Sequence, residues 1–236
     1  MISLFSECGA YHMTNGQKNQ DYVISDEDER FLVIALADGV SSRRLSARGA
    51  QAACCEIRNM LLSNGSLFFE FEKGKVSFYA LAQIRYKLRQ LAEEQQVEIG
   101  EFASTISFAL VDKLKRKMII LNLGDNMILS YDGRRIKIEA EPDNDTDGCC
   151  TTTTEMAYTC AKTEVIDCNT LDSVILMSDG AWSTMFERGK IKKLYEQAVI
   201  SGDFNSLCKI LKNEQFDDDC SFAAIDFKSM RLRGDF

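Results

Sequence analysis

The sequence predicts an α+β fold in which two mainly antiparallel sheets pack together and helices flank them. Strand-like segments follow one another without intervening helices, and helix-like segments come in pairs between these runs. A regular alternation of strands and helices, which is typical of a parallel sheet, is not seen. The 236 residues are 45% hydrophobic and 27% charged and include one proline, so we expect one compact domain over residues 1–236.

Hydrophobic spacing predicts the elements of the first half of the chain. The apolar run Phe31–Ala37 ends at Asp38-Gly39 and is typical of a central strand that is buried on both faces. Apolar residues at helical spacing predict a helix over residues 45–62, which Asn64-Gly65 would end, and a second helix over residues 77–96.

The middle of the chain changes to strand-like patterns. We expect strands over residues 105–111, 118–123, 127–131 and 135–138. Asp132-Gly133 separates the last two of these and is typical of a hairpin with a type I′ turn. The polar stretch over residues 141–155 predicts a surface loop or flap.

The last part of the chain predicts two more strands and two more helices. A buried strand over residues 174–177 ends at Ser178-Asp179-Gly180. The helix expected next has five apolar residues on one face, namely Ile191, Leu194, Tyr195, Ala198 and Val199. A further helix is expected over residues 205–212, and a final strand over residues 221–227 follows three consecutive aspartates.

Charge and hydropathy exclude several classes of protein. The net charge of −8 repels phosphate backbones, so we expect no nucleic-acid partner. The longest apolar run is far shorter than the roughly 20 residues of a membrane-spanning helix. The first residues lack the basic start and long apolar segment of a signal peptide. We therefore expect a cytoplasmic protein that does not bind a membrane.

The nine cysteines form no recognisable metal or redox motif. Their number is odd, their spacing is irregular, and no CxxC or cysteine–histidine zinc pattern occurs. We interpret them as small hydrophobic residues in a reducing cytosol.

Carboxylates occupy an unusual position in this sequence. Four of them lie where an apolar strand begins or ends, namely Asp38, Asp125, Asp179 and Asp218, and Asp21 begins a further strand. Turn chemistry alone explains a single Asp-Gly pair such as Asp132-Gly133, but it does not explain this repetition. Converging carboxylates repel one another unless a cation holds them, and all-oxygen ligands favour Mg²⁺ or Mn²⁺.

The order of these motifs resembles the protein phosphatase 2C family of metal-dependent serine/threonine phosphatases, especially its compact bacterial members. The motifs are NQD at 19–21, ADG at 37–39, STIS at 104–107, LGD at 123–125, MSDG at 177–180 and DDCS at 218–221. The resemblance implies a four-layer αββα sandwich with two mainly antiparallel sheets flanked by helix pairs.

The resemblance also implies roles for individual residues. Asp38 would bridge two metal ions, and the carbonyl group of Gly39 would ligate the second ion. Asp179 and Asp218 would complete the coordination of the first. Asp21 matches an acidic residue that supports the site.

Asp125 matches a carboxylate that helps to hold a third, looser ion in bacterial relatives. The implied reaction is hydrolysis of a phosphoserine or phosphothreonine by a water molecule that two Mn²⁺ or Mg²⁺ ions activate. The implied partners are a phosphoprotein substrate and a cognate kinase, which would place the protein in signalling.

The sequence departs from the family pattern where the substrate phosphate is held. Many relatives have an arginine five residues before the first aspartate, and Gly16 stands there in this chain. His12, the only histidine, is either a packing residue or, as in a subgroup of relatives, part of the catalytic site. Lys18, Arg43 and Arg44 are alternative phosphate contacts or solvated charges.

Two further departures affect proton transfer and the third ion. Val40 replaces a histidine that eukaryotic members have after the Asp-Gly pair, and Ser183 replaces a second acidic ligand of the third ion.

These observations leave two hypotheses from different classes. The first is an active metal-dependent phosphoprotein phosphatase, which the retained carboxylates favour. The second is a weakly active or silent phosphatase-like domain that binds phosphoproteins or regulates a partner, which the missing arginine favours. A response-regulator receiver domain also uses strand-end aspartates, but it fits poorly because the chain is too long and lacks alternating strands and helices.

Overall fold

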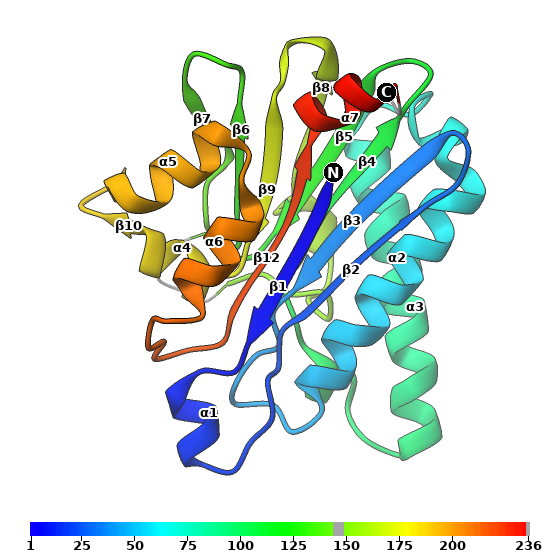
Figure 1. Cartoon of the computed structure of the whole chain (residues 1–236). Coiled ribbons are helices and arrows are strands. Elements are labelled where there is room, and N and C mark those ends of the chain that lie inside the picture. The colour runs from blue at the N-terminus through cyan, green and yellow to red at the C-terminus, as the bar shows by residue number, and fades with distance from the viewer. Residues whose placement is uncertain (144–148, 235–236) are drawn as a thin grey trace.

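Two five-stranded antiparallel sheets form the centre of the molecule (Figure 1). The computed structural model describes residues 1–143 and 149–234. In spatial order, the first sheet contains β1 (Ile2–Glu7), β12 (Cys220–Asp226), β9 (Ser173–Met177), β6 (Met127–Tyr131) and β7 (Ile136–Ala140). The second contains β2 (Tyr22–Glu27), β3 (Phe31–Ala37), β4 (Ile106–Asp112), β5 (Lys117–Leu123) and β8 (Lys162–Asp167).

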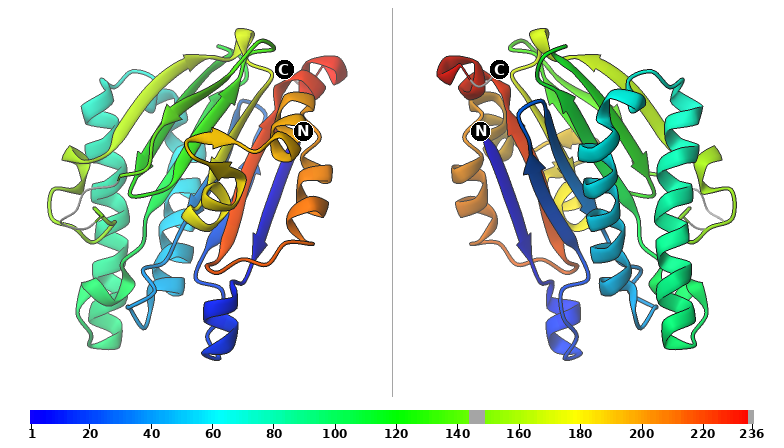
Figure 2. Two further views of the ribbon diagram at one scale, coloured as in Figure 1. Left: turned by 90° about the vertical axis from the view of Figure 1, so that its left-hand side faces the viewer. Right: turned by 90° about the vertical axis from the view of Figure 1, so that its right-hand side faces the viewer.

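Helices cover the outer face of each sheet (Figure 2). The long helices α2 (Ser46–Phe68) and α3 (Lys73–Gln95) lie on the second sheet. The first sheet is covered by α4 (Asp179–Met185), α5 (Lys193–Ser201) and α6 (Phe204–Leu211). The expected four-layer order of helices, sheet, sheet and helices is therefore confirmed.

Smaller elements complete the described chain. Helix α1 (Ala10–Thr14) follows β1, α7 (Phe227–Arg233) follows β12, and β10 (Phe186–Glu187) pairs with β11 (Lys190–Ile191). Single 3₁₀ turns occupy Ile99–Phe102, Ala157–Thr159 and Cys168–Thr170.

The continuous apolar strands have a core on each face. In β3, Val33 and Ala35 pack towards α2 and α3, while Leu32, Ile34 and Leu36 pack between the sheets. Successive side chains of a strand point to opposite faces, so a strand in the middle layers of a four-layer fold needs an apolar residue at every position.

Two local predictions were wrong. The helix expected over residues 45–62 continues past Asn64, which alone leaves helical geometry, and ends at Phe68. Four residues, not two, separate the paired Tyr131 and Ile136, so the hairpin has no type I′ two-residue turn. Instead the Asp132 carboxylate accepts hydrogen bonds from the N–H groups of Arg134 and Arg135.

The cysteine interpretation also needs a correction. Cys150 and Cys160 form a disulfide, although the other cysteines are free. Cys150 lies within the polar stretch over residues 141–155, of which residues 144–148 lie outside the described chain, and Cys160 follows that stretch. Among the described helices, none combines the length and apolarity needed to cross a bilayer.

A partly buried ion pair joins two hairpins of the second sheet. Asp112 is fully buried and accepts hydrogen bonds from Arg30 Nη2 at 2.7 Å and Nε at 3.2 Å, and from the N–H groups of Leu114 and Lys115. Burial disfavours the charged form, but the hydrogen bonds from Arg30 and the backbone outweigh it and lower the pKa of Asp112.

We expect Asp112→Ala to lower the free energy of unfolding by roughly 2–3 kcal/mol, because Arg30 and two N–H groups lose their acceptor. The loss should shrink as the pH falls below the ordinary value of 3.8, because protonation then removes the same charge in the parent. Urea unfolding at neutral and at acidic pH measures the loss of unfolding free energy and its dependence on pH. Asp26→Ala breaks the more exposed pair with Arg58 and is the control. Equal losses in the two variants would contradict this assignment.

Candidate active site

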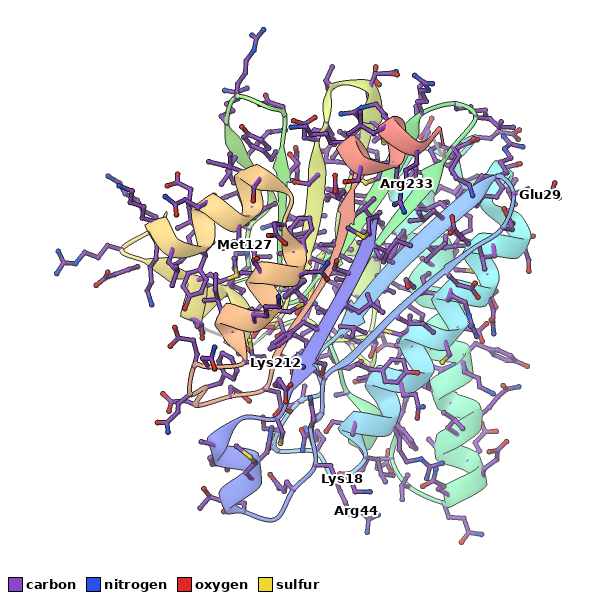
Figure 3. All side chains as sticks on the ribbon, viewed as in Figure 1. Lys18, Glu29, Arg44, Met127, Lys212 and Arg233 are labelled. Atoms are coloured by element: carbon purple, nitrogen blue, oxygen red, sulfur yellow. A yellow bond between two sulfur atoms is a disulfide. The ribbon has the colours of Figure 1, made fainter. Side chains whose placement is uncertain are left out.

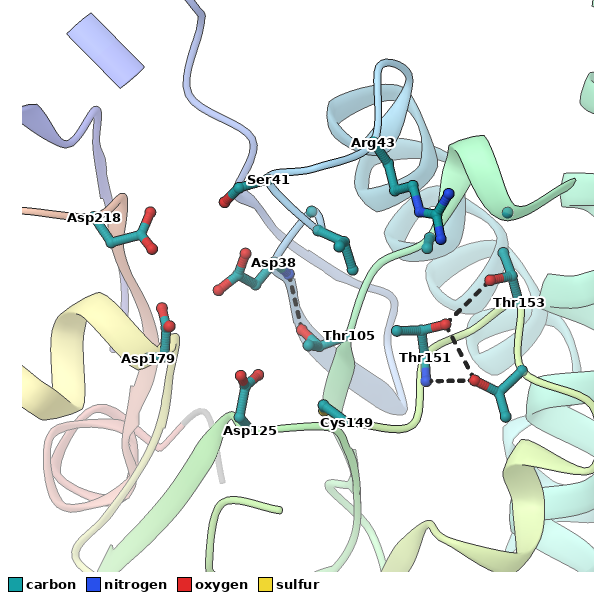
Figure 4. A pocket seen from close by; sticks show the side chains of 15 residues that line it. Asp38, Ser41, Arg43, Thr105, Asp125, Cys149, Thr151, Thr153, Asp179 and Asp218 are labelled. Carbon is teal, nitrogen blue, oxygen red and sulfur yellow. Dashed lines mark hydrogen bonds between the residues drawn. The ribbon is translucent and has the colours of Figure 1, made fainter. Parts of the chain in front are cut away.

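Four of the five predicted carboxylates line one pocket of about 500 Å³. Asp38, Asp125, Asp179 and Asp218 come from four separate segments, and their carboxyl groups face a common space (Figure 4). Asp179 is close enough to Asp38 for its carboxyl group to raise the pKa of Asp38. The predicted convergence of strand-end aspartates is therefore present in the structure.

Asp38 is held in place by backbone contacts on both sides. Its N–H group donates to Thr105 Oγ1 at 2.9 Å, and its carbonyl oxygen accepts from the N–H group of Thr105 at 2.8 Å. Gly39, the next residue, lies so close to its neighbours that a Cβ atom would be 2.9 Å from the carbonyl oxygen of Gln20. Glycine is required there because the chain passes tightly between two other segments.

Asp179 and Asp218 are brought together by a similar close approach. Asp179 is the first residue of α4, at the end of β9, and Asp218 lies two residues before β12. A Cβ atom on Gly180 would be 2.2 Å from the carbonyl oxygen of Asp219. The Asp-Gly pair at this position therefore brings the first turn of α4 against the segment that carries Asp218.

Asp125 is positioned by a bridge between the two sheets. It lies between β5 and β6, and its carbonyl oxygen accepts a hydrogen bond from Trp182 Nε1 at 2.8 Å. The next residue, Asn126, is fully buried and donates to Thr105 Oγ1 at 2.8 Å and to Ser107 Oγ at 3.0 Å. Thr105 thus connects the backbone of Asp38 with the loop that carries Asp125.

The crowding of these carboxylates raises their pKa values. Burial, followed by the charges of Asp21, Asp179 and Asp125, raises the pKa of Asp38 well above its ordinary value. Burial and the nearby charge of Asp218 raise the pKa of Asp179. Burial and the charge of Asp179 raise the pKa of Asp125 to about 6. Without a cation, some of these groups take up protons to relieve their mutual repulsion.

His12 and Asp21 lie behind the pocket and do not line it. His12 is buried in α1, with Nδ1 2.9 Å from Asp219 Oδ2 and 3.9 Å from Asp218 Oδ1. Asp21 is also buried, near the hydroxyl groups of Ser178 and Ser221, and burial raises its pKa. Both residues can act on the pocket only through its other members.

Sequence reasoning missed the role of Asp219. Its carboxylate is buried and accepts hydrogen bonds from the N–H groups of Gly9 at 2.8 Å and Gln20 at 2.6 Å, in addition to its contact with His12. It therefore joins the segment before β12 to both ends of the segment that contains α1. The triplet of aspartates was the available signal, but it did not show which member is turned inwards.

The structure also separates the candidate phosphate contacts. Arg43 lines the pocket, whereas Arg44 and Lys18 do not. Gly16 lies in a turn with φ of +66° and does not line the pocket either. Ser183 is turned away, with its hydroxyl group donating to the carbonyl oxygen of Gly180.

The polar stretch forms one wall of the pocket. Cys149, Thr151, Thr153 and Thr154 line it. Thr151 and Thr153 lie on the side opposite Asp179 and Asp218 (Figure 4). Thr152 is buried, and its N–H group donates to the carbonyl oxygen of Ser104 at 2.8 Å. The described part of this predicted loop therefore packs against the site.

Comparisons with known proteins agree on one family. The family description that matches residues 8–220 is protein phosphatase 2C. A search of curated proteins gave no match to the sequence.

Three solved structures illustrate the fold similarity. A bacterial serine phosphatase is 16% identical, with a TM-score of 0.68 over 94% of this chain and 96% of that chain. The serine/threonine phosphatase Stp1 from Staphylococcus aureus is 15% identical, with a TM-score of 0.63 over 95% and 94%. RsbX in complex with magnesium is 12% identical, with a TM-score of 0.60 over 94% and 92%. At sequence identities this low, the structural similarity shows a shared fold only.

We expect Thr105→Val to damage the site without changing the shape of the side chain. The N–H group of Asp38 and the amide of Asn126 both lose an acceptor, so the free energy of unfolding should fall by about 1–3 kcal/mol. Mn²⁺ affinity, measured by calorimetry, should fall as well. Thr170→Val, at an exposed hydroxyl group, is the control. Unchanged stability and Mn²⁺ affinity in Thr105→Val would show that the hydroxyl group of Thr105 does not position Asp38.

Proposed function

The chain belongs to the protein phosphatase 2C family, and from this premise we propose that it is a metal-dependent phosphatase that hydrolyses phosphoserine or phosphothreonine in proteins. The observation that carries this proposal is the convergence of Asp38, Asp179 and Asp218 in one pocket. We infer that residues 1–236 act as a single phosphatase domain. The proposed partners are a phosphoprotein substrate and the kinase that phosphorylates it.

The pocket fits divalent cations by its chemistry. Asp179 Oδ1 is buried and has no hydrogen-bond partner among the described residues, so it lacks the contact that a buried carboxylate oxygen needs. Burial and neighbouring acids raise the pKa of Asp38, Asp125 and Asp179 together. Hard cations with oxygen ligands relieve both problems, and a related fold, that of RsbX, was solved with magnesium.

We assign the metal ligands residue by residue. Asp38 would bridge two ions, Mn²⁺ or Mg²⁺, and the carbonyl oxygen of Gly39 would hold the second. Asp179 and Asp218 would complete the first site, and Asp125 would help to hold a third ion. When bound, such ions supply an acidified water molecule as the nucleophile and offset charge on the phosphoryl oxygens.

Arg43 is the residue that we assign to the substrate phosphate. It lines the same pocket as the carboxylates, and its guanidinium group can hold two phosphoryl oxygens at once. Gly16 cannot do this, because it has no side chain and lies outside the pocket. Arg43 would therefore orient the phosphate for attack from the side of the carboxylates.

A silent, regulatory role is the second candidate. The observation that favours it is the absence of an arginine at Gly16. The retained carboxylates favour catalysis, because a silent site has no need of charges that cost folding free energy. Turnover of p-nitrophenyl phosphate that depends on Mn²⁺ supports the phosphatase, and its absence supports the silent domain.

We expect Asp38→Asn to lower this turnover by roughly a hundred-fold or more, because it removes a ligand charge that two ions would share. Asp179→Asn and Asp218→Asn should act in the same direction, chiefly through one ion. Asp132→Asn is the matched control, since an asparagine oxygen can accept the same turn hydrogen bonds. Activity of Asp38→Asn close to that of the parent, in excess Mn²⁺, would refute the two-metal mechanism.

His12→Ala tests whether the buried histidine positions the metal ligands. We expect the Mn²⁺ concentration for half-maximal activity to rise roughly ten- to a hundred-fold, because the segment with Asp218 loses a support behind it. Asp219→Asn, which alters the same contact, should show the same shift. A fall in kcat with unchanged Mn²⁺ dependence would contradict this role, because it would show that His12 does not position the metal ligands.

Arg43→Ala should raise KM for p-nitrophenyl phosphate by roughly ten-fold, because one charge-assisted contact to the phosphate is lost. Steady-state kinetics at saturating Mn²⁺ separates this effect from a change in kcat. Arg48→Ala is the control, because Arg48 is an exposed arginine of α2 that does not line this pocket. Equal KM values in the two variants would remove Arg43 from phosphate binding.

A further inference from the structure

A second pocket adjoins the one that contains the carboxylates. Its volume is about 530 Å³, and it shares Ser41 and Arg43 with the first pocket. Lys18, from the chain between α1 and β2, and Arg44, from the turn before α2, lie on its wall and share one edge of the molecule (Figure 3). The two pockets therefore form neighbouring parts of one surface.

The charge of the second pocket is opposite to that of the first. Three cations line it, namely Lys18, Arg43 and Arg44, and no carboxylate does. No ion pair connects any of the three with a described residue. The carboxylate of Glu101 lies nearby, but it accepts from the backbone N–H group of Arg44 at 3.2 Å. Unpaired cations gathered in a chain with a net charge of −8 attract an anion.

The floor of this pocket is firmly connected to the proposed metal site. Gln20 is buried, lines the second pocket, and accepts a hydrogen bond from Ser46 Oγ at 2.9 Å through its side-chain oxygen. Its carbonyl oxygen accepts from the N–H group of Gly39 at 3.2 Å, and its own N–H group donates to Asp219 Oδ2 at 2.6 Å. Gln20 thus connects the second pocket by hydrogen bonds to the residues next to Asp38 and Asp218.

We propose that the second pocket binds another phosphate group of the same phosphoprotein segment, close in sequence to the phosphorylated residue that is hydrolysed. This inference rests on the proposed phosphatase function. The Arg44 guanidinium group and the Lys18 ammonium group, which line only this pocket, suit a phosphate dianion better than a single carboxylate, because guanidinium binds phosphate through two parallel hydrogen bonds. Ser41 and Ser42 add hydroxyl groups on the same wall. The substrates selected would be multiply phosphorylated segments.

Peptide pairs test this specificity. Each peptide contains one phosphothreonine and, one to five residues away, serine, aspartate, or a non-hydrolysable phosphonate analogue of phosphoserine. At the best spacing we expect the phosphonate peptide to have a KM roughly ten-fold lower than the serine peptide, which corresponds to one added charge-assisted contact. The aspartate peptide should fall between them. Rising salt should reduce the preference.

Variants connect the preference to the pocket. Lys18→Glu combined with Arg44→Glu should abolish the preference for the phosphonate peptide. The matched control is Arg134→Glu combined with Lys193→Glu, which makes the same charge change at exposed residues outside both pockets and should keep it. Equal KM values for the three peptides with the parent, or an undiminished preference in the pocket variant, would overturn the inference.

A binding measurement separates this inference from the proposed catalysis. Fluorescence anisotropy with labelled serine and phosphonate peptides reports affinity without turnover, in the parent and in both double variants. If p-nitrophenyl phosphate is not hydrolysed but the pocket-dependent preference persists in binding, the second pocket stands and the catalytic proposal fails. If hydrolysis occurs and binding shows no preference, only the second pocket is refuted.

Discussion

Repulsion among buried carboxylates is the constraint on which the rest of this structure depends. Asp38, Asp125, Asp179 and Asp218 face one space, and burial together with neighbouring acids raises the pKa of the first three. Such a cluster lowers the stability of the fold unless a cation occupies it. Many of the surrounding features hold these groups together against that repulsion: the tight passages at Gly39 and Gly180, the Thr105 bridge, and the buried Asp219.

The four-layer architecture makes this convergence possible. Strands of two different sheets end at the same edge, so residues that are distant in sequence meet there without any local sequence relation. The sheets are rigid because their middle strands have apolar side chains on both faces. At the same edge, the turn after Asp38 supplies Arg43 to the first pocket and Arg44 to the second. One turn therefore connects the acidic surface that we propose for catalysis with the basic surface that we propose for substrate selection.

Sequence reasoning predicted the central strands and the aspartates because both leave strong local signals. A strand buried on two faces is a continuous apolar run, and a carboxylate that abuts it is conspicuous. The edge strands β1 and β8 were missed because they are half exposed and lack such a run. The seven-residue helix α4 is too short to show a helical period. The choice between Arg43 and Arg44, and the inward turn of Asp219, depend on backbone direction and packing, which spacing does not encode.

The central claim is that the cluster of Asp38, Asp179 and Asp218 exists to hold divalent cations. Anomalous diffraction at the manganese absorption edge, from crystals of the protein grown with Mn²⁺, tests it most directly. The account predicts two strong peaks in contact with the carboxylate of Asp38, one of them shared with Asp179 and Asp218. Well-ordered crystals in which these carboxylates show no manganese peak, at a Mn²⁺ concentration that supports full activity, would contradict it.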